Sequence, residues 1–178
     1  MTKKKAPQLD TEFFRYAGHI AHDWATLEYM ISHTIWKAAG LDDVLGACIT
    51  AQIYSLPPKI GALRLLLRSR GVSNGLLEKL NAFSERSREY SEIRNRAVHD
   101  PLGVHATDNS VRQIQITAQG KLVFETRKVT LEEFEKFSER ISSFLSGFID
   151  LKNEIEDELS KLPYTHQRKF PVITRGTL

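Results

Sequence analysis

The sequence has little that could cross-link the chain or span a bilayer. Cys48 is its one cysteine, so no disulfide can form within the chain, and we expect it to be a small core residue. The longest stretch without charge, residues 44–58, is too short to cross a membrane. No apolar stretch follows the basic start MTKKKAPQLD, which therefore does not resemble a secretory signal. These absences predict a cytoplasmic protein with no membrane partner.

Sequence patterns that bind metals or phosphate groups are also missing. The chain has no HExxH motif, no cysteine pair, no metal-spaced carboxylate cluster and no glycine-rich phosphate loop. His22 and His33 share a helical face, but they lie about three turns apart, too far to hold one metal together. We therefore expect neither a metal nor another cofactor.

The length of 178 residues is enough for one domain with a real hydrophobic core. The net charge of +3 is unevenly spread, because both ends are basic and contain no acid. The basic residues of the ends are Lys3, Lys4, Lys5, Lys161, Arg168, Lys169 and Arg175. Between them, residues 59–99 are net basic and residues 130–160 strongly acidic. The basic segment suits contact with phosphates, although two merely solvated surfaces explain the charge equally well.

Apolar residues at three- and four-residue intervals predict five helices. Their expected bounds are Thr11–Ala39, Leu41–Tyr54, Lys59–Ser69, Ser73–His99, and Thr130 to about Leu159. Gly40 and Gly71 suit the ends of the first and third helices. Pro57 and Pro58 are expected to stop the second helix, and Pro101 to end the fourth near His99.

Between the last two expected helices the pattern changes to alternation. VRQIQIT at residues 111–117 and KLVFETR at residues 121–127 are typical of two strands, with Ala118-Gln119-Gly120 as the turn between them. Thr130 and Glu133 form a capping box for the last helix. The expected fold is mainly α, an antiparallel helical bundle with an inserted β-hairpin over residues 10–160. A basic, mobile tail is expected over residues 161–178.

The segment EYSEIRNRAVHDP carries the most specific pattern. On a helical wheel, Arg94 falls within the apolar face of the fourth helix, while Asn95 and His99, four residues apart, share a neighbouring polar face. A charged side chain on an apolar face is costly to bury without partners. We therefore expect Arg94 to point inward or across an interface, beside the polar stripe that holds Asn95 and His99.

Arg94-Asn95, three further residues and His99 resemble the signature of the HEPN family. That resemblance implies a homodimeric, metal-independent endoribonuclease that acts on RNA, with roles in toxin–antitoxin or antiviral systems and an antitoxin or other regulatory protein as a partner. Arg94 suits two phosphate oxygens, and His99 suits acid or base catalysis near neutral pH. Asn95 is expected to orient His99 or the phosphate. The family often takes one more polar residue from an early helix, for which Asp23 and Glu28 are the candidates.

Two other interpretations of these residues stay open. Asn95 and His99 suit a simple hydrogen-bonding pair at a helix end, with Arg94 paired to Glu28 or Asp23. HEPN-like modules also serve without catalysis, as binding partners of a protein or a nucleic acid. A DNA-binding regulator is a weaker alternative, because no recognition helix is evident.

Overall fold

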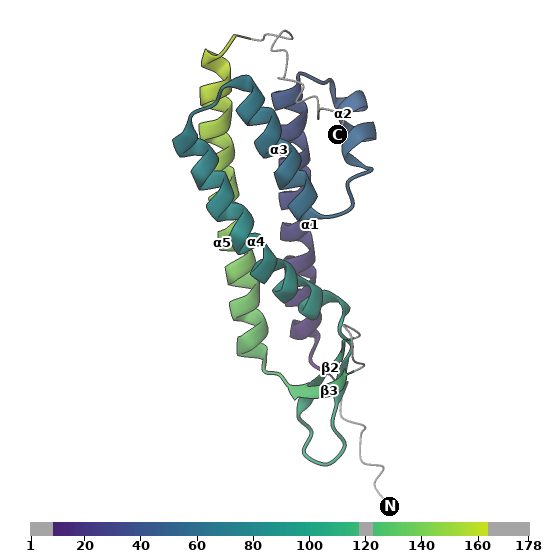
Figure 1. The fold of residues 1–178 in the computed structure, drawn as a ribbon. Helices are drawn as coiled ribbons and strands as arrows, with labels where there is room; N and C mark the ends of the chain where they lie inside the picture. The colour runs from purple at the N-terminus through teal and green to yellow at the C-terminus, as the bar shows by residue number, and fades with distance from the viewer. Residues whose placement is uncertain (1–8, 118–122, 164–178) are drawn as a thin grey trace, which may run out of the picture. The chain divides into compact units, whose positions relative to one another are not determined.

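A computed structural model of the chain describes residues 9–117 and 123–163. Within these ranges it contains five helices and three strands (Figure 1). The helices are α1 (Thr11–Ala39), α2 (Asp43–Thr50), α3 (Leu56–Arg70), α4 (Asn74–His99) and α5 (Leu131–Lys161). The strands are β1 (Leu102–Val104), β2 (Val111–Thr117) and β3 (Val123–Lys128). The protein is therefore mainly helical, with a small antiparallel sheet in the order β1-β2-β3.

The chain divides into two compact units. The first unit takes the chain up to Met30 together with Phe83–Asp150, and the second takes Ile31–Ala82 together with the chain from Leu151 onward. Helices α1, α4 and α5 each contribute residues to both units. The expected single domain over residues 10–160 stays a prediction.

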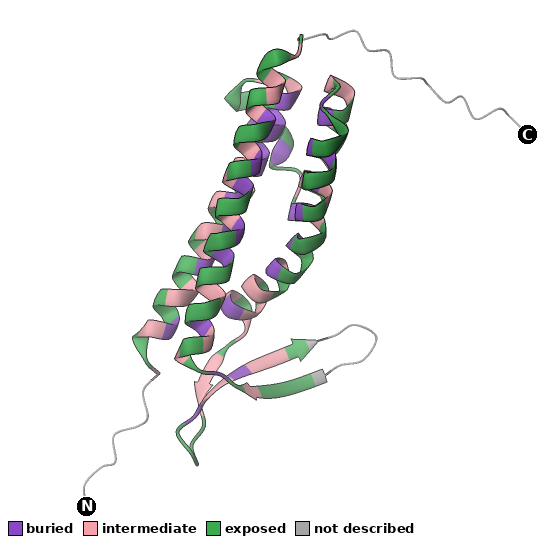
Figure 2. Ribbon diagram, turned by 90° about the vertical axis from the view of Figure 1, so that its left-hand side faces the viewer, coloured by how far each residue is buried: buried purple, intermediate pink, exposed green. Residues whose placement is uncertain are grey.

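Aromatic side chains form much of the core of the first unit. Phe144 of α5 stacks on Phe83 and on Tyr90 of α4, with ring centroids 4.3 Å and 4.1 Å apart. Phe13 of α1 meets Phe134 of α5 edge to face at 5.1 Å. Each stacked or edge-on pair adds about 0.5–1.5 kcal/mol to the stabilisation from burial. The buried residues follow one stripe of each helix (Figure 2), and the stacked rings hold α4 close to α5 just before the Arg94 motif.

The sheet lies in the first unit and joins the end of α4 to the start of α5. β2 pairs antiparallel with both neighbours, and Ile116 lies opposite Phe124 in its pairing with β3. The strands therefore occupy most of the residues in which alternation was expected, whereas β1 was not predicted. The expected turn at residues 118–120 lies outside the described residues.

The turn between β1 and β2 is built around Asp108. The Ser110 hydroxyl and backbone N–H and the His105 ring hold the pKa of Asp108 well below its usual range. A lowered carboxyl pKa means that these bonds support the turn at neutral pH and are lost when acid protonates Asp108.

Two glycines end helices as the sequence predicted. Gly40 and Gly71 have φ values of 64° and 84°, in the left-handed region that favours glycine. The next residue closes each turn, since the Leu41 N–H donates to the Trp36 carbonyl at 2.9 Å and the Val72 N–H to the Leu67 carbonyl at 3.1 Å. These bonds satisfy carbonyls that the last helical turn leaves open. The fourth helix likewise ends at His99, as Pro101 predicted.

The prediction that Pro57 and Pro58 end the second helix was wrong. Both prolines lie in the first turn of α3, after Ser55 in an extended conformation. A proline is tolerated there because the first helical N–H groups have no partner within the helix and the fixed φ suits a helix start. α2 ends earlier, at Thr50, and it begins at Asp43 because the Asp42 carboxylate accepts from the Val44 and Leu45 N–H groups, both at 2.9 Å.

Two further expectations need correction. Cys48 is exposed, because α2 buries Gly46 and Thr50 and turns Cys48 outward. Only half of the expected capping box forms at α5, since Thr130 accepts from the Glu133 N–H at 3.2 Å while the Glu133 carboxylate pairs with Arg127. α5 continues through Lys161, the first residue of the expected tail; residues 164–178 lie outside the described part, so the tail stays a prediction.

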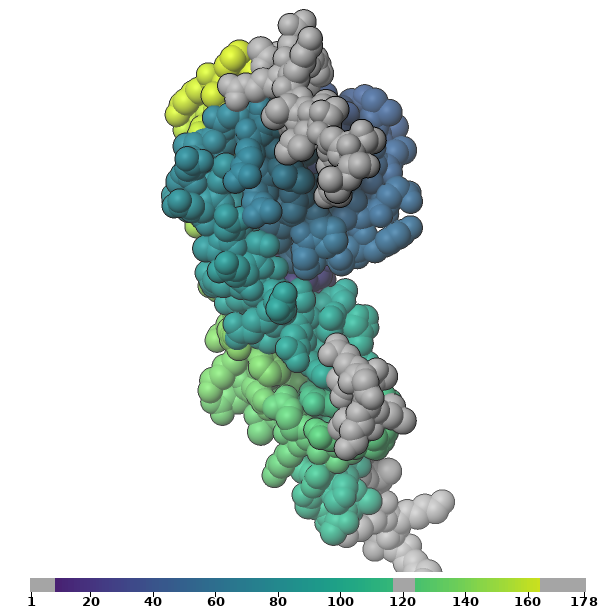
Figure 3. All heavy atoms as spheres, in the orientation of Figure 1, coloured from purple at the N-terminus to yellow at the C-terminus, as the bar shows by residue number. Residues whose placement is uncertain are grey.

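In the second unit, α2 packs on Trp36 through a residue that has no side chain. A Cβ atom added to Gly46 would lie 2.3 Å from Cγ of the Trp36 ring. The Trp36 indole N–H donates to the Thr50 hydroxyl at 2.9 Å, and that hydroxyl donates to the Gly46 carbonyl at 2.8 Å. On the opposite side of α2, Val44 is 73% exposed and Leu45 55% exposed. The helix α2 lies at the surface in Figure 3. Contact with Trp36 thus depends on glycine at position 46.

Gly46→Ala is expected to lower the free energy of unfolding by about 1–3 kcal/mol, because the methyl group meets the inner part of a buried ring and not a flexible chain end. Gly61→Ala in α3 is the control, since a Cβ there meets nothing within 4 Å. That change should leave stability equal or slightly higher, because alanine favours helix. Urea denaturation of both variants tests this, and equal midpoints would contradict the close packing on Trp36.

Candidate functional site

The last turn of α4 brings the predicted site residues together. α4 runs unbroken from Asn74 to His99, so Asn95 and His99 lie one turn apart on the same face. The Asp100 N–H donates to the Arg96 carbonyl at 3.3 Å, which completes the turn before Pro101. The site therefore occupies the C-terminal end of a helix whose preceding turns are anchored on α5.

Arg94 contacts both of the other motif residues. Its Nη1 lies 2.9 Å from Oδ1 of Asn95 and 2.9 Å from Nε2 of His99. A guanidinium has donors but no acceptor. Nε2 of His99 must therefore accept in this arrangement, and the ring proton lies on Nδ1. The motif is thus a bonded cluster in which one guanidinium nitrogen holds the amide and the imidazole.

The guanidinium of Arg94 is partly withdrawn from solvent. Arg94 is half-buried, and its Nε is buried with no hydrogen-bond partner among the described residues. An N–H group that lacks a partner in a buried position costs free energy. Its Nη1, however, meets the exposed polar stripe of Asn95 and His99, so the expected inward or interface position of Arg94 stays a prediction.

An open hollow of about 710 Å³ lies beside the cluster. Asn95 and His99 are both exposed there, whereas Arg94 is not among the lining residues. The hollow is lined by Arg88, Ser91, Glu92, Asn95, Arg96, His99, Asp100 and Ile116. It thus combines the polar stripe of α4 with one residue of β2, and it exposes an imidazole to whatever enters.

Gln113 of β2 supports the end of α4 and is a residue that the sequence reasoning missed. Its side chain is fully buried, and its Nε2 donates to the backbone carbonyl of Arg96 at 2.7 Å. Arg96 in turn pairs with Asp100 at 3.3 Å. Alternation placed Gln113 on a strand face with Gln115, but a glutamine at such a position ordinarily faces solvent. Nothing in the pattern distinguished it from its neighbour.

Asp23 and Glu28, the candidates for a supporting polar residue, have other partners. The Ser142 hydroxyl of α5 donates to the Asp23 carboxylate. The Trp24 indole N–H donates to Glu28 at 2.9 Å. Neither carboxylate lines the hollow at His99. The structure therefore brings Arg94, Asn95 and His99 together without these two acids, and their supporting role stays a prediction.

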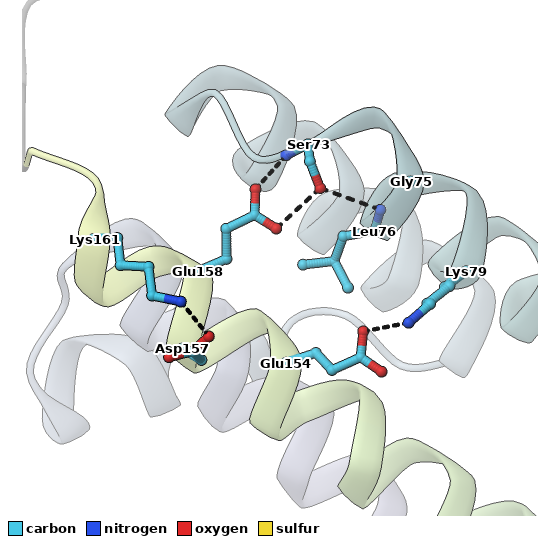
Figure 4. A pocket seen from close by; sticks show the side chains of 8 residues that line it. All are labelled: Ser73, Gly75, Leu76, Lys79, Glu154, Asp157, Glu158 and Lys161. Carbon is cyan, nitrogen blue, oxygen red and sulfur yellow. Dashed lines mark hydrogen bonds and ion pairs between the residues drawn. The ribbon is translucent and has the colours of Figure 1, made fainter.

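A second hollow, of about 530 Å³, lies in the second unit between α4 and α5 (Figure 4). Its charged groups are paired with one another, Lys79 with Glu154 at 2.5 Å and Lys161 with Asp157 at 2.6 Å. Glu158 accepts from the Ser73 N–H at 2.5 Å and from its hydroxyl at 3.0 Å, at the start of α4. These contacts cap a helix and link two helices, which is a structural role.

Comparison with protein-family models, with curated proteins and with solved structures finds no match to this chain. Over the part of the chain that the structure describes, no helix is long and apolar enough to cross a membrane. Within the same residues, no group of three or more His, Cys, Asp or Glu side chains is arranged to hold a metal ion. Function is therefore inferred from the geometry at Arg94, Asn95 and His99.

Gln113→Glu is expected to lower the free energy of unfolding by about 2 kcal/mol or more. The change keeps the shape of the side chain, but it removes the donor to the Arg96 carbonyl and buries a carboxylate. Gln115→Glu is the matched control on the half-buried neighbouring position, where the cost should stay under about 1 kcal/mol. Urea denaturation gives both values, and equal losses would show that Gln113 does not anchor the end of α4.

Proposed function

We propose that the protein is a metal-independent endoribonuclease that cuts RNA through attack of the RNA's own 2′-hydroxyl on the adjacent phosphate. The observation that carries this proposal is the contact of Arg94 with both Asn95 and His99, each at 2.9 Å, beside an open hollow. Such a cluster offers a charge for the phosphate and a group that exchanges protons near neutral pH. The resemblance of the motif to the HEPN family supports the same reaction.

The reaction needs two proton transfers and one stabilised charge. A bond forms between the 2′-oxygen and phosphorus as the 2′-hydroxyl loses its proton to a base. The bond to the 5′-oxygen then breaks as that oxygen takes up a proton, which leaves a 2′,3′-cyclic phosphate and a 5′-hydroxyl end. His99 serves one of these transfers. Arg94 stabilises the added negative charge on the pentavalent phosphorus, where two parallel N–H donors suit two oxygens.

Arg94 links phosphate binding to the state of His99. Without substrate, Nη1 of Arg94 occupies the lone pair of His99 Nε2. A phosphate beside the cluster competes for the same donor, because an anionic oxygen is a stronger acceptor than a neutral ring nitrogen. When Arg94 turns to the phosphate, Nε2 becomes available to accept a proton. Asn95, held by the same Nη1, orients the ring or the phosphate during this exchange.

Both Arg94→Ala and His99→Ala should slow RNA cleavage by about 10²–10⁴-fold, because each removes a positioned charge or proton carrier. Cleavage by the wild type should persist in EDTA. The measurement is the rate of product formation from a labelled single-stranded RNA with EDTA present, together with detection of the cyclic phosphate end. Arg94→Lys keeps the charge but loses the planar fork, so it should recover only a small part of the rate.

His19→Ala and Arg68→Ala are matched controls, since both residues are exposed and lie outside the site. They should cut RNA as fast as the wild type. If folded Arg94→Ala and His99→Ala also cut at the wild-type rate, or if EDTA stops the wild type, the ribonuclease mechanism is wrong. If both variants unfold while the controls stay folded, the motif is a structural polar cluster.

The proposal includes a homodimer and the antiparallel helical bundle of the HEPN family. The resemblance of the motif to that family is what supports the dimer. Light scattering should then give a mass about twice 20.3 kDa at micromolar concentration. A mass that stays near 20.3 kDa across that range would remove the dimer from the proposal.

In a cell, such an enzyme fits a toxin or an antiviral effector in the cytoplasm, controlled by an antitoxin or another regulatory protein. The second candidate function is a non-catalytic module of the same type. The observation that favours it is the exposed apolar side of α2, where Val44 and Leu45 face solvent, because such surfaces often mark contacts with another protein. Folded wild-type protein that binds RNA or a partner without cutting RNA would favour this candidate.

A further inference from the structure

Two large apolar side chains are exposed directly opposite each other on the sheet. Ile116 of β2 and Phe124 of β3 are partners in the register, so their side chains lie on the same face. Ile116 is 57% exposed and Phe124 65% exposed. Side by side they form an exposed apolar pair, which is more informative than a single exposed apolar residue.

The two faces of β2 and β3 differ in how they are used. One face holds the buried Gln113 and the ion pair of Arg127 with Glu133. The other, which we call the open sheet face, consists of Arg112, Ile114, Ile116, Phe124, Thr126 and Lys128, paired as Arg112 with Lys128, Ile114 with Thr126, and Ile116 with Phe124. The three β3 residues of this face are all exposed. The open sheet face is thus a surface on which a ligand can lie.

The side chains of the open sheet face suit a polyanion with planar groups. It carries two basic residues, Arg112 and Lys128, and none of its six described side chains is acidic. Arg112 lies 3.5 Å from Asp108, while Lys128 is exposed. Successive pairs on one face of a strand lie about 6.6–6.8 Å apart, so basic, polar and aromatic positions follow one another in a line.

The open sheet face continues into the candidate active site. Ile116 lines the same hollow as Asn95 and His99. A chain whose phosphate lies at His99 can therefore reach Phe124 through Ile116, the cross-strand neighbour. Proteins bind single-stranded nucleic acid by stacking unpaired bases on exposed aromatic rings of a sheet, beside basic groups that meet the backbone. Paired bases cannot be reached in this way.

We propose that the open sheet face is the binding platform for single-stranded RNA at this site, with Phe124 stacking on an unpaired base near the scissile phosphate. The proposal rests on the proposed ribonuclease function, since it places the substrate relative to His99. Ile116 forms the apolar floor beside the ring, and Lys128 meets a backbone phosphate farther along the strand. The substrate class is therefore RNA with at least a short unpaired stretch.

The test measures binding of the full chain to a short single-stranded oligoribonucleotide whose 2′-hydroxyls are methylated, so that it cannot be cut. Phe124→Ala should weaken binding about 5- to 100-fold, which corresponds to the loss of one stacked base. Phe124→Trp should keep the wild-type affinity. Phe14→Ala is the matched control, because Phe14 of α1 is 59% exposed but does not line the hollow, and it should change binding less than twofold.

An abasic scan of the same oligonucleotide adds a second readout. One abasic position should weaken binding to the wild type, and that position should no longer matter in Phe124→Ala, as expected when both changes remove one contact. A fully paired duplex of the same sequence should bind more weakly than the single strand. If Phe124→Ala binds like Phe14→Ala, or if the duplex binds as tightly as the single strand, the platform is overturned, and the exposed pair is then better assigned to a protein partner.

The two proposals fail in different ways. If cleavage depends on His99 while Phe124→Ala binds RNA like the control, the platform is wrong and the ribonuclease stands. If His99→Ala cuts RNA as fast as wild type while Phe124→Ala loses affinity, the active site is wrong and the platform stands as an RNA-binding surface.

Discussion

A single buried amide, the side chain of Gln113, joins the end of α4 to the sheet. It donates to the Arg96 carbonyl at 2.7 Å, inside the turn that carries Asn95 and His99. The same side chain accepts weakly from Arg127, at 3.4 Å, and Arg127 pairs with Glu133 in the first turn of α5. The end of one helix, the middle of the sheet and the start of the next helix therefore depend on one another. A helix end of this kind would otherwise fray, because its last carbonyls have no partner within the helix.

Much of the local structure could be predicted from the sequence, because the residues concerned act through the backbone. Pro101 excludes a helical Asp100, and Gly40 and Gly71 supply left-handed conformations that few other residues adopt. The change from three-four spacing to alternation predicted strands between α4 and α5, because successive side chains of a strand point to opposite faces. Asn95 and His99 share a face of α4 because the helical repeat fixes their separation, whereas the contacts of Arg94 with both were not predicted.

The remaining features depend on packing between distant residues, which periodicity does not record. Pro57 and Pro58 suit either the end of one helix or the start of the next. In the structure Ser55 is extended, and both prolines lie in the first turn of the next helix. Cys48 lies in an apolar run, yet α2 is held to Trp36 through Gly46 and Thr50 and leaves Cys48 exposed. Gln113 and Gln115 are equivalent in the pattern, and only the approach of the Arg96 carbonyl distinguishes them. Asp23 likewise meets Ser142, which is 119 positions away in sequence.

The order β1-β2-β3 leaves the outer side of β3 without a neighbouring strand among the described residues. An unpaired strand edge next to an exposed phenylalanine is a template on which other chains can add, and so a route to aggregation. β3 carries Glu125, Arg127 and Lys128 in the positions just after Phe124, and charges so close to an edge oppose the addition of a further strand. Surface engineering of this protein for solubility should therefore keep these charges. Without them, Ile116 and Phe124 would lie beside a strand edge that has no charge to oppose the addition of another strand.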